Sequence, residues 1–186
     1  MNSENIQRVA LVGGGVIGSG WATRCLAHGL SVVVTDPAPG AAEFVRKTID
    51  SAWPVLEQAG LDQQASRDKL EFAPDIEAAV VGADFVQENV PERLEIKHRV
   101  LAELDAHAPE GVVIGSSTSG IKPSELQSAC TRDPGRVIVA HPFNPVYLLP
   151  LVELVGGEHT APVVTERARA QYAALGMRPL VVRREI

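Results

Sequence analysis

Short runs of β-branched and aliphatic residues alternate along the chain with longer stretches of mixed polarity. Because these apolar runs are nearly continuous, they are typical of strands buried on both faces of a parallel sheet. The pattern predicts strands at 8–12, 31–35, 83–87, 111–114, 136–140, 151–155 and 179–182, with a weaker candidate at 69–72.

The stretches between these runs carry apolar residues at helical spacing. They predict helices over 16–28, 41–59, 91–104, 123–130 and 160–175. Pro91 suits the first position of a helix, Pro54 is expected to kink or split the helix that contains it, and Gly176 is a C-cap signal. Alternating strands and helices imply right-handed βαβ units, so we predict an α/β fold with a doubly wound, mostly parallel sheet.

Composition and charge narrow the class of protein. The 186 residues amount to about one domain, 45% are apolar, and the net charge is −6 without a basic stripe, which argues against nucleic-acid binding. No apolar run is long enough to span a membrane, and residues 1–5 lack the charged and apolar parts of a secretion signal. Cys25 and Cys130 show no metal-ligand spacing, so we expect no metal site and reduced thiols in a cytoplasmic protein.

A glycine-rich loop follows the first predicted strand. The run Gly13-Gly14-Gly15-Val16-Ile17-Gly18 matches G-x-G-x-x-G, and Asp36 stands 18 residues beyond its last glycine at the end of the second strand. In a Rossmann-type fold these glycines allow a tight turn, a pyrophosphate against the backbone, and close packing of helix on strand. The acidic side chain accepts hydrogen bonds from ribose hydroxyls, which favours NAD over NADP. The alternative is a structural turn beside a solvated aspartate.

The second half of the chain carries a serine cluster, a histidine and a glutamate. The cluster 115–120 and His141 each follow a predicted strand, so both belong to the carboxyl edge of the sheet, where open α/β folds bind ligands. Glu153 stands inside the apolar run 151–157, so we expect it to be buried and to need a partner such as His141. The alternatives are a turn cluster, a capping histidine and a solvated glutamate on an edge strand.

Several motifs together resemble the 3-hydroxyacyl-CoA dehydrogenase superfamily. They are the glycine loop, VPERLEIK at 90–97, SSTSG at 116–120 and HPFNP at 141–145. Within that superfamily, the stretch 141–157 resembles most the branch of enzymes that oxidise L-carnitine. The resemblance covers nearly the whole chain.

The resemblance implies roles for individual residues. His141 would be the catalytic base, Glu153 its partner, and Ser119 the hydroxyl that hydrogen-bonds the substrate oxygen. Glu92 and Lys97 would contact the cofactor, NAD. The implied reaction is reversible oxidation of a secondary alcohol, in which His141 takes the hydroxyl proton while hydride leaves the same carbon.

Members of this superfamily act on different substrates, and the charge of one segment helps to choose among them. The segment 41–72 carries more acidic than basic side chains, which disfavours the phosphates of coenzyme A and favours a small 3-hydroxy acid. L-carnitine is the preferred substrate, and Phe143 and Tyr147 are candidate cation–π contacts for its trimethylammonium group. L-gulonate or a 3-hydroxyacyl-CoA are alternatives, and a non-catalytic dinucleotide-binding or redox-sensing module is an alternative of another class.

The length of 186 residues bears on the domain organisation of the protein. The resemblance implies a longer protein, in which a helical C-terminal domain closes the substrate pocket and forms a homodimer interface. We therefore expect residues 1–186 to form an NAD-binding domain that carries the catalytic pair, without a second domain, and to turn over poorly by itself. The sequence leaves open the true 3-hydroxy acid, the physiological direction and the oligomeric state.

Overall fold

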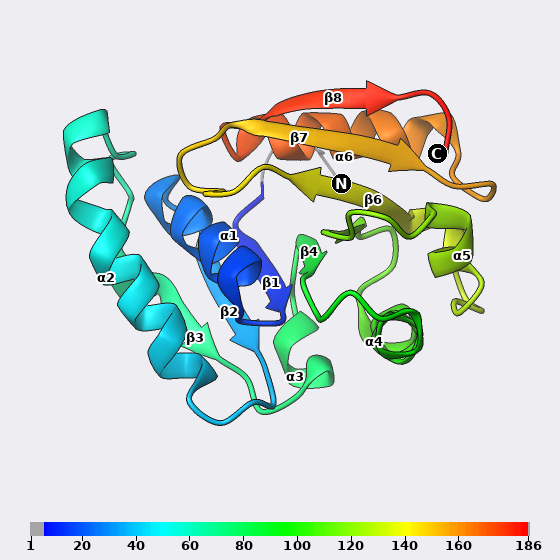
Figure 1. The fold of residues 1–186 in the computed structure, drawn as a ribbon, viewed down its shortest axis with the longest axis horizontal. Helices are drawn as coiled ribbons and strands as arrows, with labels where there is room; N and C mark the ends of the chain where they lie inside the picture. The colour runs from blue at the N-terminus through cyan, green and yellow to red at the C-terminus, as the bar shows by residue number, and fades with distance from the viewer. Residues whose placement is uncertain (1–5, 186) are drawn as a thin grey trace.

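The computed structural model describes residues 6–185, so the N-terminal segment 1–5 lies outside the described residues. Within the described part, the strands form one eight-stranded sheet in the order β3-β2-β1-β4-β5-β6-β7-β8 (Figure 1). The strands are β1 (Arg8–Val12), β2 (Ser31–Thr35), β3 (Leu70–Phe72), β4 (Phe85–Glu88), β5 (Ile114–Ser116), β6 (Val137–Pro142), β7 (Leu151–Gly156) and β8 (Arg178–Val182).

The strand order is that of a doubly wound sheet. The chain runs from the central β1 outward to β2 and β3, then returns to place β4 on the other side of β1. Pairing is parallel from β3 to β6; β7 is antiparallel to β6, and β8 is parallel to β7. The predicted α/β fold with a mostly parallel sheet is therefore confirmed.

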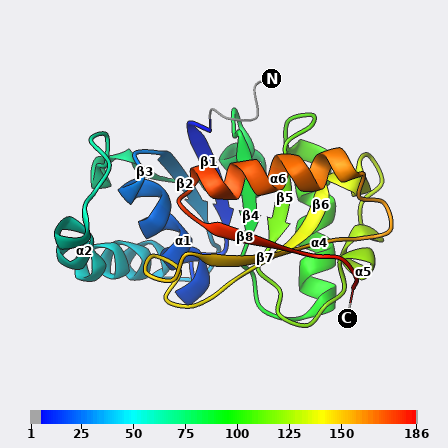
Figure 2. The same cartoon turned by 90° about the horizontal axis from the view of Figure 1, so that it is seen from above.

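Helices cover both faces of the sheet and close two apolar cores. They are α1 (Val16–Ala27), α2 (Ala41–Ala59), α3 (Ile76–Val80), α4 (Leu94–His107), α5 (Pro123–Gln127) and α6 (Pro162–Ala174), with 3-10 turns η1 (Arg67–Lys69) and η2 (Pro134–Arg136). One core joins α1, α2 and α6 to the sheet, and the other joins α3, α4 and α5 to it. Figure 2 shows α6 lying along β7 and β8. No helix in residues 6–185 has the length and apolarity to cross a bilayer.

Some predicted boundaries are wrong, and the reasons are local. Helix α4 begins at Leu94, because Pro91 instead belongs to a tight turn in which its carbonyl accepts the N–H of Arg93 at 2.7 Å. Helix α3 is too short to show a periodic pattern; it begins after Asp75, whose carboxylate accepts the N–H of Ala78. Helix α5 ends at Gln127, three residues before the predicted end.

The proline and glycine signals have different outcomes. Helix α2 is not split at Pro54, because its buried face continues on both sides of the proline through Ile49 and Leu56. After α6, Gly176 has φ +71°, its N–H donates to Ala173, and the next N–H donates to Tyr172. This is the Schellman pattern, so the predicted C-cap is confirmed.

The two cysteines lie in the interior as free thiols. Cys25 is fully buried in the core on the α1 side and Cys130 is almost fully buried in the other core. Burial raises the pKa of each thiol to about 12. Both side chains are therefore protonated packing residues.

A buried ion pair joins α4 to the start of β6. The Arg136 guanidinium lies 3.1 Å from an Asp105 carboxylate oxygen, with both side chains under 5% exposed. The carboxylate also accepts the N–H groups of Thr131, Arg132 and Asp133. Burial alone raises the pKa of Asp105, but these donors outweigh burial and lower it.

We expect Asp105→Asn to lower the free energy of unfolding by about 2–4 kcal/mol at neutral pH, because it leaves a buried guanidinium without its counter-ion. The matched control is Asp50→Asn, which removes the exposed pair with Arg67 and should cost ~0.5 kcal/mol or less. Urea denaturation measures both. Because the folded-state pKa of Asp105 is lowered, the difference from wild type should shrink as the pH falls through the acid range. Equal losses in the two variants would contradict this account.

Candidate active site

The carboxyl ends of β1, β4, β5 and β6 meet at one edge of the sheet (Figure 1). Strand order reverses between β1 and β4, and a crevice at such a switch point is where doubly wound sheets bind ligands. The glycine loop follows β1 at this edge, while Ser119 and His141 follow or end β5 and β6. The fold thus brings segments far apart in the sequence to one place.

The outer two glycines of the loop are required by the protein itself. Gly13 has φ +95°, and a Cβ there would lie 2.7 Å from the backbone of Asn89. A Cβ on Gly18 would collide with the carbonyl of Gly13, so only glycine lets α1 approach the end of β1 this closely. The predicted tight turn and close helix–strand packing are both present.

Gly15 has no such internal reason to be glycine. A Cβ built there meets nothing within 4 Å. Gly15 is the N-cap of α1, and no side chain caps that helix end. The free N–H groups and the positive end of the helix dipole therefore face open space, with Val16 59% exposed beside them. This arrangement fits the pyrophosphate of a dinucleotide.

Asp36 stands beside the glycine loop, at the end of β2. One carboxylate oxygen accepts the N–H of Gly14 at 2.7 Å and the other accepts the N–H of Ala38 at 2.8 Å. The side chain is half-buried. These bonds fix the carboxylate next to the loop, where it can also accept bonds from ribose hydroxyls.

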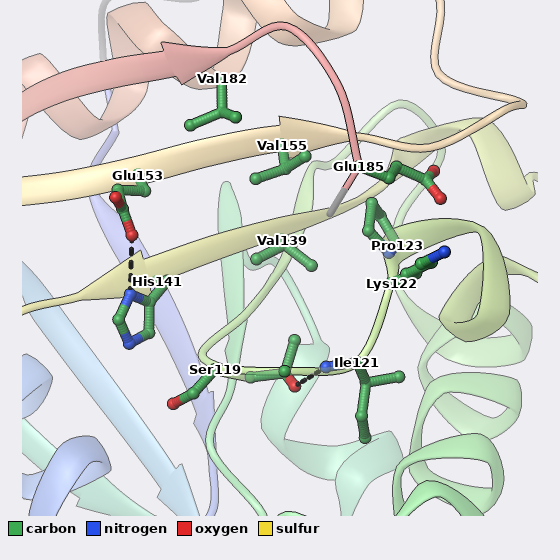
Figure 3. Close-up of a pocket in the computed structure, with 12 residues that line it drawn as sticks. Ser119, Ile121, Lys122, Pro123, Val139, His141, Glu153, Val155, Val182 and Glu185 are labelled. Atoms are coloured by element: carbon green, nitrogen blue, oxygen red, sulfur yellow. Dashed lines mark hydrogen bonds and ion pairs between the residues drawn. The ribbon is translucent and has the colours of Figure 1, made fainter.

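His141 and Glu153 face each other across the antiparallel strands β6 and β7 as directly paired residues. Imidazole Nδ1 lies 3.0 Å from Glu153 Oε2 (Figure 3). The side chains are 28% and 35% exposed, so the expectation that Glu153 is buried is wrong. Glu153 points to the sheet face that α6 does not cover, whereas its neighbours Val152 and Leu154 point into the core.

A pocket opens beside this pair. It is lined by the loop from Thr118 to Pro123, by Val139, Val155 and Val182, and by Glu185. Figure 3 shows the second imidazole nitrogen of His141 directed away from Glu153, on the side where the hydroxyl of Ser119 lies. The pocket therefore combines an imidazole nitrogen and a hydroxyl at one end with an aliphatic wall.

Glu92 holds the loop that carries Ser119. Its Oε1 accepts the Thr118 hydroxyl at 2.6 Å and the N–H groups of Ser119 and Gly120 at 2.9 and 3.1 Å. Partial burial raises the pKa of Glu92, but these donors and the charge of Lys97 outweigh it and lower that pKa. The carboxylate is therefore ionised at neutral pH.

Lys97 lies beneath this loop. Its side chain is only 1% exposed, and its ammonium lies 2.8 Å from Glu88 and 3.4 Å from Glu92. Glu88 in turn accepts the Ser116 hydroxyl and the N–H of Val90. Lys97 is therefore buried behind Glu92, and its contact with the site is the ion pair with that carboxylate.

Sequence analysis does not single out Glu88, Thr118 or the buried Gln87. All three act through contacts between separate strands and loops, which no local pattern reveals. One available signal is an acidic residue that ends a buried strand, as Glu88 ends β4. Such a residue needs a buried partner, because an unpaired charge in the interior of a protein is costly.

The fold and the glycine loop define a dinucleotide-binding domain of the kind found in dehydrogenases. A sequence model of the family described as "3-hydroxyacyl-CoA dehydrogenase, NAD binding domain" matches residues 8–186. The chain belongs to the 3-hydroxyacyl-CoA dehydrogenase family, and its cofactor is NAD.

Curated relatives are more specific. The chain is 55% identical over 181 residues to an L-carnitine dehydrogenase of Oceanobacillus iheyensis, covering 97% of this chain and 59% of that protein. It is also 55% identical to an L-carnitine dehydrogenase of Pseudomonas putida, covering 97% of this chain and 56% of that protein. The chain thus spans somewhat more than half the length of these relatives.

Solved structures agree on the fold. A 5-formyl-3-hydroxy-2-methylpyridine 4-carboxylic acid 5-dehydrogenase matches with a TM-score of 0.88 and 35% identity, over 98% of this chain and 59% of that chain. The 3-hydroxybutyryl-CoA dehydrogenase of Escherichia coli K12 matches with a TM-score of 0.86 and 30% identity, over 95% of this chain and 38% of that chain.

We expect Gly15→Ala to weaken NADH binding by about tenfold or more while leaving the unfolding midpoint nearly unchanged, because its methyl group projects into free space that a pyrophosphate would occupy. The matched variant is Gly14→Ala, whose Cβ would lie 3.0 Å from Val45 and should first lower the midpoint. NADH fluorescence titration and thermal unfolding measure the two effects. Undiminished NADH affinity in Gly15→Ala would show that the pyrophosphate does not bind there.

Proposed function

We propose that this protein catalyses the reversible, NAD-dependent oxidation of the 3-hydroxyl group of L-carnitine to 3-dehydrocarnitine. The observation that carries the proposal is the His141–Glu153 pair, which lines a pocket together with Ser119. A protein that only bound or sensed NAD would need neither side chain. The names of the curated relatives support L-carnitine as the substrate.

The pair is arranged for general base catalysis. A carboxylate can only accept hydrogen bonds, so Glu153 holds the proton on Nδ1 of His141 and leaves a lone pair on Nε2. Nε2 can then take the proton of the substrate hydroxyl. The imidazolium that forms is stabilised by the Glu153 carboxylate 3.0 Å away.

Other residues of the chain place the reacting groups. The hydroxyl of Ser119 can hydrogen-bond the substrate oxygen, and Glu92 fixes the Ser119 backbone. Gly15 and Asp36 would hold the pyrophosphate and ribose of NAD, and Glu92, beside the loop of Ser119, would be a further cofactor contact. Bound NAD would supply the acceptor for the hydride that leaves the carbon bearing the hydroxyl.

We expect His141→Gln to lower kcat for L-carnitine about a hundredfold or more, because it removes the base, while leaving NADH affinity within about twofold. Absorbance at 340 nm and NADH titration measure the two quantities. His98→Gln, a change at a half-buried histidine on α4 whose ring bonds the Glu125 carbonyl, is the control. Unchanged turnover in His141→Gln would refute the assignment. Tight NADH binding without turnover on L-carnitine, L-gulonate or a 3-hydroxyacyl-CoA would favour the redox-sensing alternative.

Phe143 supports a cationic substrate. It is 38% exposed, and its ring centroid lies 5.5 Å from that of His141. Tyr147, the other aromatic candidate, packs partly buried against the core. An exposed aromatic ring beside the base, with the Glu153 carboxylate nearby, can bind the trimethylammonium group of carnitine by cation–π attraction.

We expect Phe143→Leu to raise KM for L-carnitine about threefold to tenfold, because it removes the ring but keeps an apolar side chain. Phe143→Tyr, which keeps a ring, should stay near wild type. The matched substrate is 3-hydroxy-5,5-dimethylhexanoate, in which an uncharged tert-butyl group replaces the trimethylammonium group. Its KM should be insensitive to Phe143→Leu. Equal changes for both substrates would indicate simple packing.

The proposal extends to the setting of the enzyme. Residues 1–186 would form the NAD-binding domain with the catalytic pair, and the whole enzyme would be a homodimer, as the resemblance to the superfamily implies. A cytoplasmic location is supported by Cys25 and Cys130, which lie apart as buried free thiols.

A further inference from the structure

A buried polar cluster lies directly behind the pocket residues. It consists of Trp21 on α1, Gln87 and Asn89 at the end of β4, Ser117 after β5, and Tyr172 on α6. Gln87 and Tyr172 are fully buried, and Trp21 is 1% exposed. We call these five residues the Gln87 cluster.

The donor and acceptor of each hydrogen bond in the cluster can be assigned, because some of its groups can only donate and others can only accept. The main-chain carbonyl of Gln87 can only accept a hydrogen bond, so the Asn89 amide nitrogen donates to it at 3.0 Å. The Asn89 amide oxygen therefore faces Ser117. The Ser117 hydroxyl must therefore give its single proton to Asn89 at 2.8 Å.

The remaining directions follow in turn. Because the Ser117 oxygen has given its proton to Asn89, it accepts from the Trp21 indole N–H at 3.2 Å and from the Gln87 amide nitrogen at 2.8 Å. The amide oxygen of Gln87 then faces Tyr172, whose hydroxyl donates to it. Burial raises the pKa of Tyr172 well above its ordinary value, so this hydroxyl keeps its proton. No proton in this chain of bonds is free to move to a substrate.

The Gln87 amide also joins the two segments that carry the proposed catalytic groups. Its nitrogen lies 3.3 Å from the carbonyl of Ala140, the residue before His141, and 2.8 Å from Ser117, two residues before Ser119. Through Ser117 it is linked to Trp21 on the helix that begins at the glycine loop. One amide nitrogen therefore spans the ends of β5 and β6.

The neighbouring backbone leaves room for this amide. Gly115 lies opposite on β5, and a Cβ there would lie 2.6 Å from the Gln87 amide oxygen and would collide with the Tyr172 hydroxyl. The cluster thus occupies the space of a missing side chain. Because the site is buried, an unpaired donor or acceptor in it is costly, so the cluster has one stable arrangement.

We propose that Gln87 is a positioning residue that sets the spacing between Ser119 and His141, and that Ser117 is a structural hydroxyl rather than a catalytic one. The kinetic part rests on the proposed function. The geometric part concerns the free protein and does not.

The test compares two buried glutamines. Gln87→Leu removes the bridge between β5 and β6, while Gln127→Leu removes a glutamine that is 1% exposed and bonds Val137, Thr160 and His159 away from the pair. We expect Gln87→Leu to lower kcat about tenfold to a hundredfold with NADH affinity within about twofold, since small displacements of catalytic groups have effects of this size. Gln127→Leu should keep kcat despite a similar loss of thermal stability. Unchanged kcat in Gln87→Leu, or an equal fall in both, would overturn the proposal.

A second variant covers the case in which Gln87→Leu does not fold. Gln87→Glu keeps the acceptor toward Tyr172 but, when ionised, lacks both donors; a protonated carboxyl restores one. Its kcat relative to wild type should therefore rise as the pH falls, whereas a pH-independent ratio would count against the proposal. Gln127→Glu is the matched control.

Nuclear magnetic resonance tests the geometry without substrate. In ¹⁵N-tryptophan-labelled protein, Gln87→Leu or Gln87→Glu should shift the Trp21 indole resonance and speed its hydrogen exchange, with Trp53 as internal reference. The His141 ring resonances should shift as well. If both signals stay unchanged, the geometric proposal fails; if they change while wild type turns over none of the substrates, only the proposed function fails.

Discussion

The register between β6 and β7 is the constraint on which the site depends. Val152 and Leu154 are fully buried in the core that α6 closes, and this alternation leaves Glu153 on the opposite face of the sheet. A slip of one residue would bring Glu153 into that core and place an aliphatic side chain beside His141. The apolar packing of β7 sets the strand register, and that register brings the imidazole and the carboxylate into contact.

A second constraint is that the carboxyl edge of the sheet is built from buried polar groups with complete hydrogen bonding. The ion pair of Glu88 with Lys97 and the Gln87 cluster both lie there. In the described part of the chain, the buried side-chain atoms without a partner are Arg8 Nε, Arg136 Nε and Gln171 Oε1, none of which lines the pocket. Loops held by satisfied buried bonds are rigid, which suits the proposed site, where a base and a hydroxyl must keep a fixed spacing.

What the sequence predicted is what short-range physics determines. The strands, the glycine loop and the Gly176 cap depend on neighbours within a few residues. The loop and the cap are found where expected, and most strands lie within two residues of their predicted bounds. The strand predicted at 111–114 is misplaced, because β5 begins only at Ile114 and continues to Ser116. The antiparallel direction of β7 was not predicted, although the stretch 143–150 is too short for a crossover between parallel strands. Glu153 was expected to be buried because its strand neighbours are apolar, yet its face of the sheet is left open. Single hydrogen bonds of the Gln87 cluster join residues up to 96 positions apart, and such contacts have no local signature.

The roles of Glu92 and Lys97 are best understood together. Resemblance assigns both to the cofactor, but one Glu92 oxygen already accepts three donors from the loop of Ser119, and Lys97 is enclosed between two carboxylates. Only Glu92 Oε2 is left to face a ligand, 3.4 Å from the Lys97 ammonium. A ligand group bound to Glu92 Oε2 would therefore be influenced by the charge of Lys97 without contacting the lysine directly. Because the same carboxylate accepts the backbone N–H of Ser119, any movement of Glu92 on cofactor binding would also move the hydroxyl that we propose places the substrate.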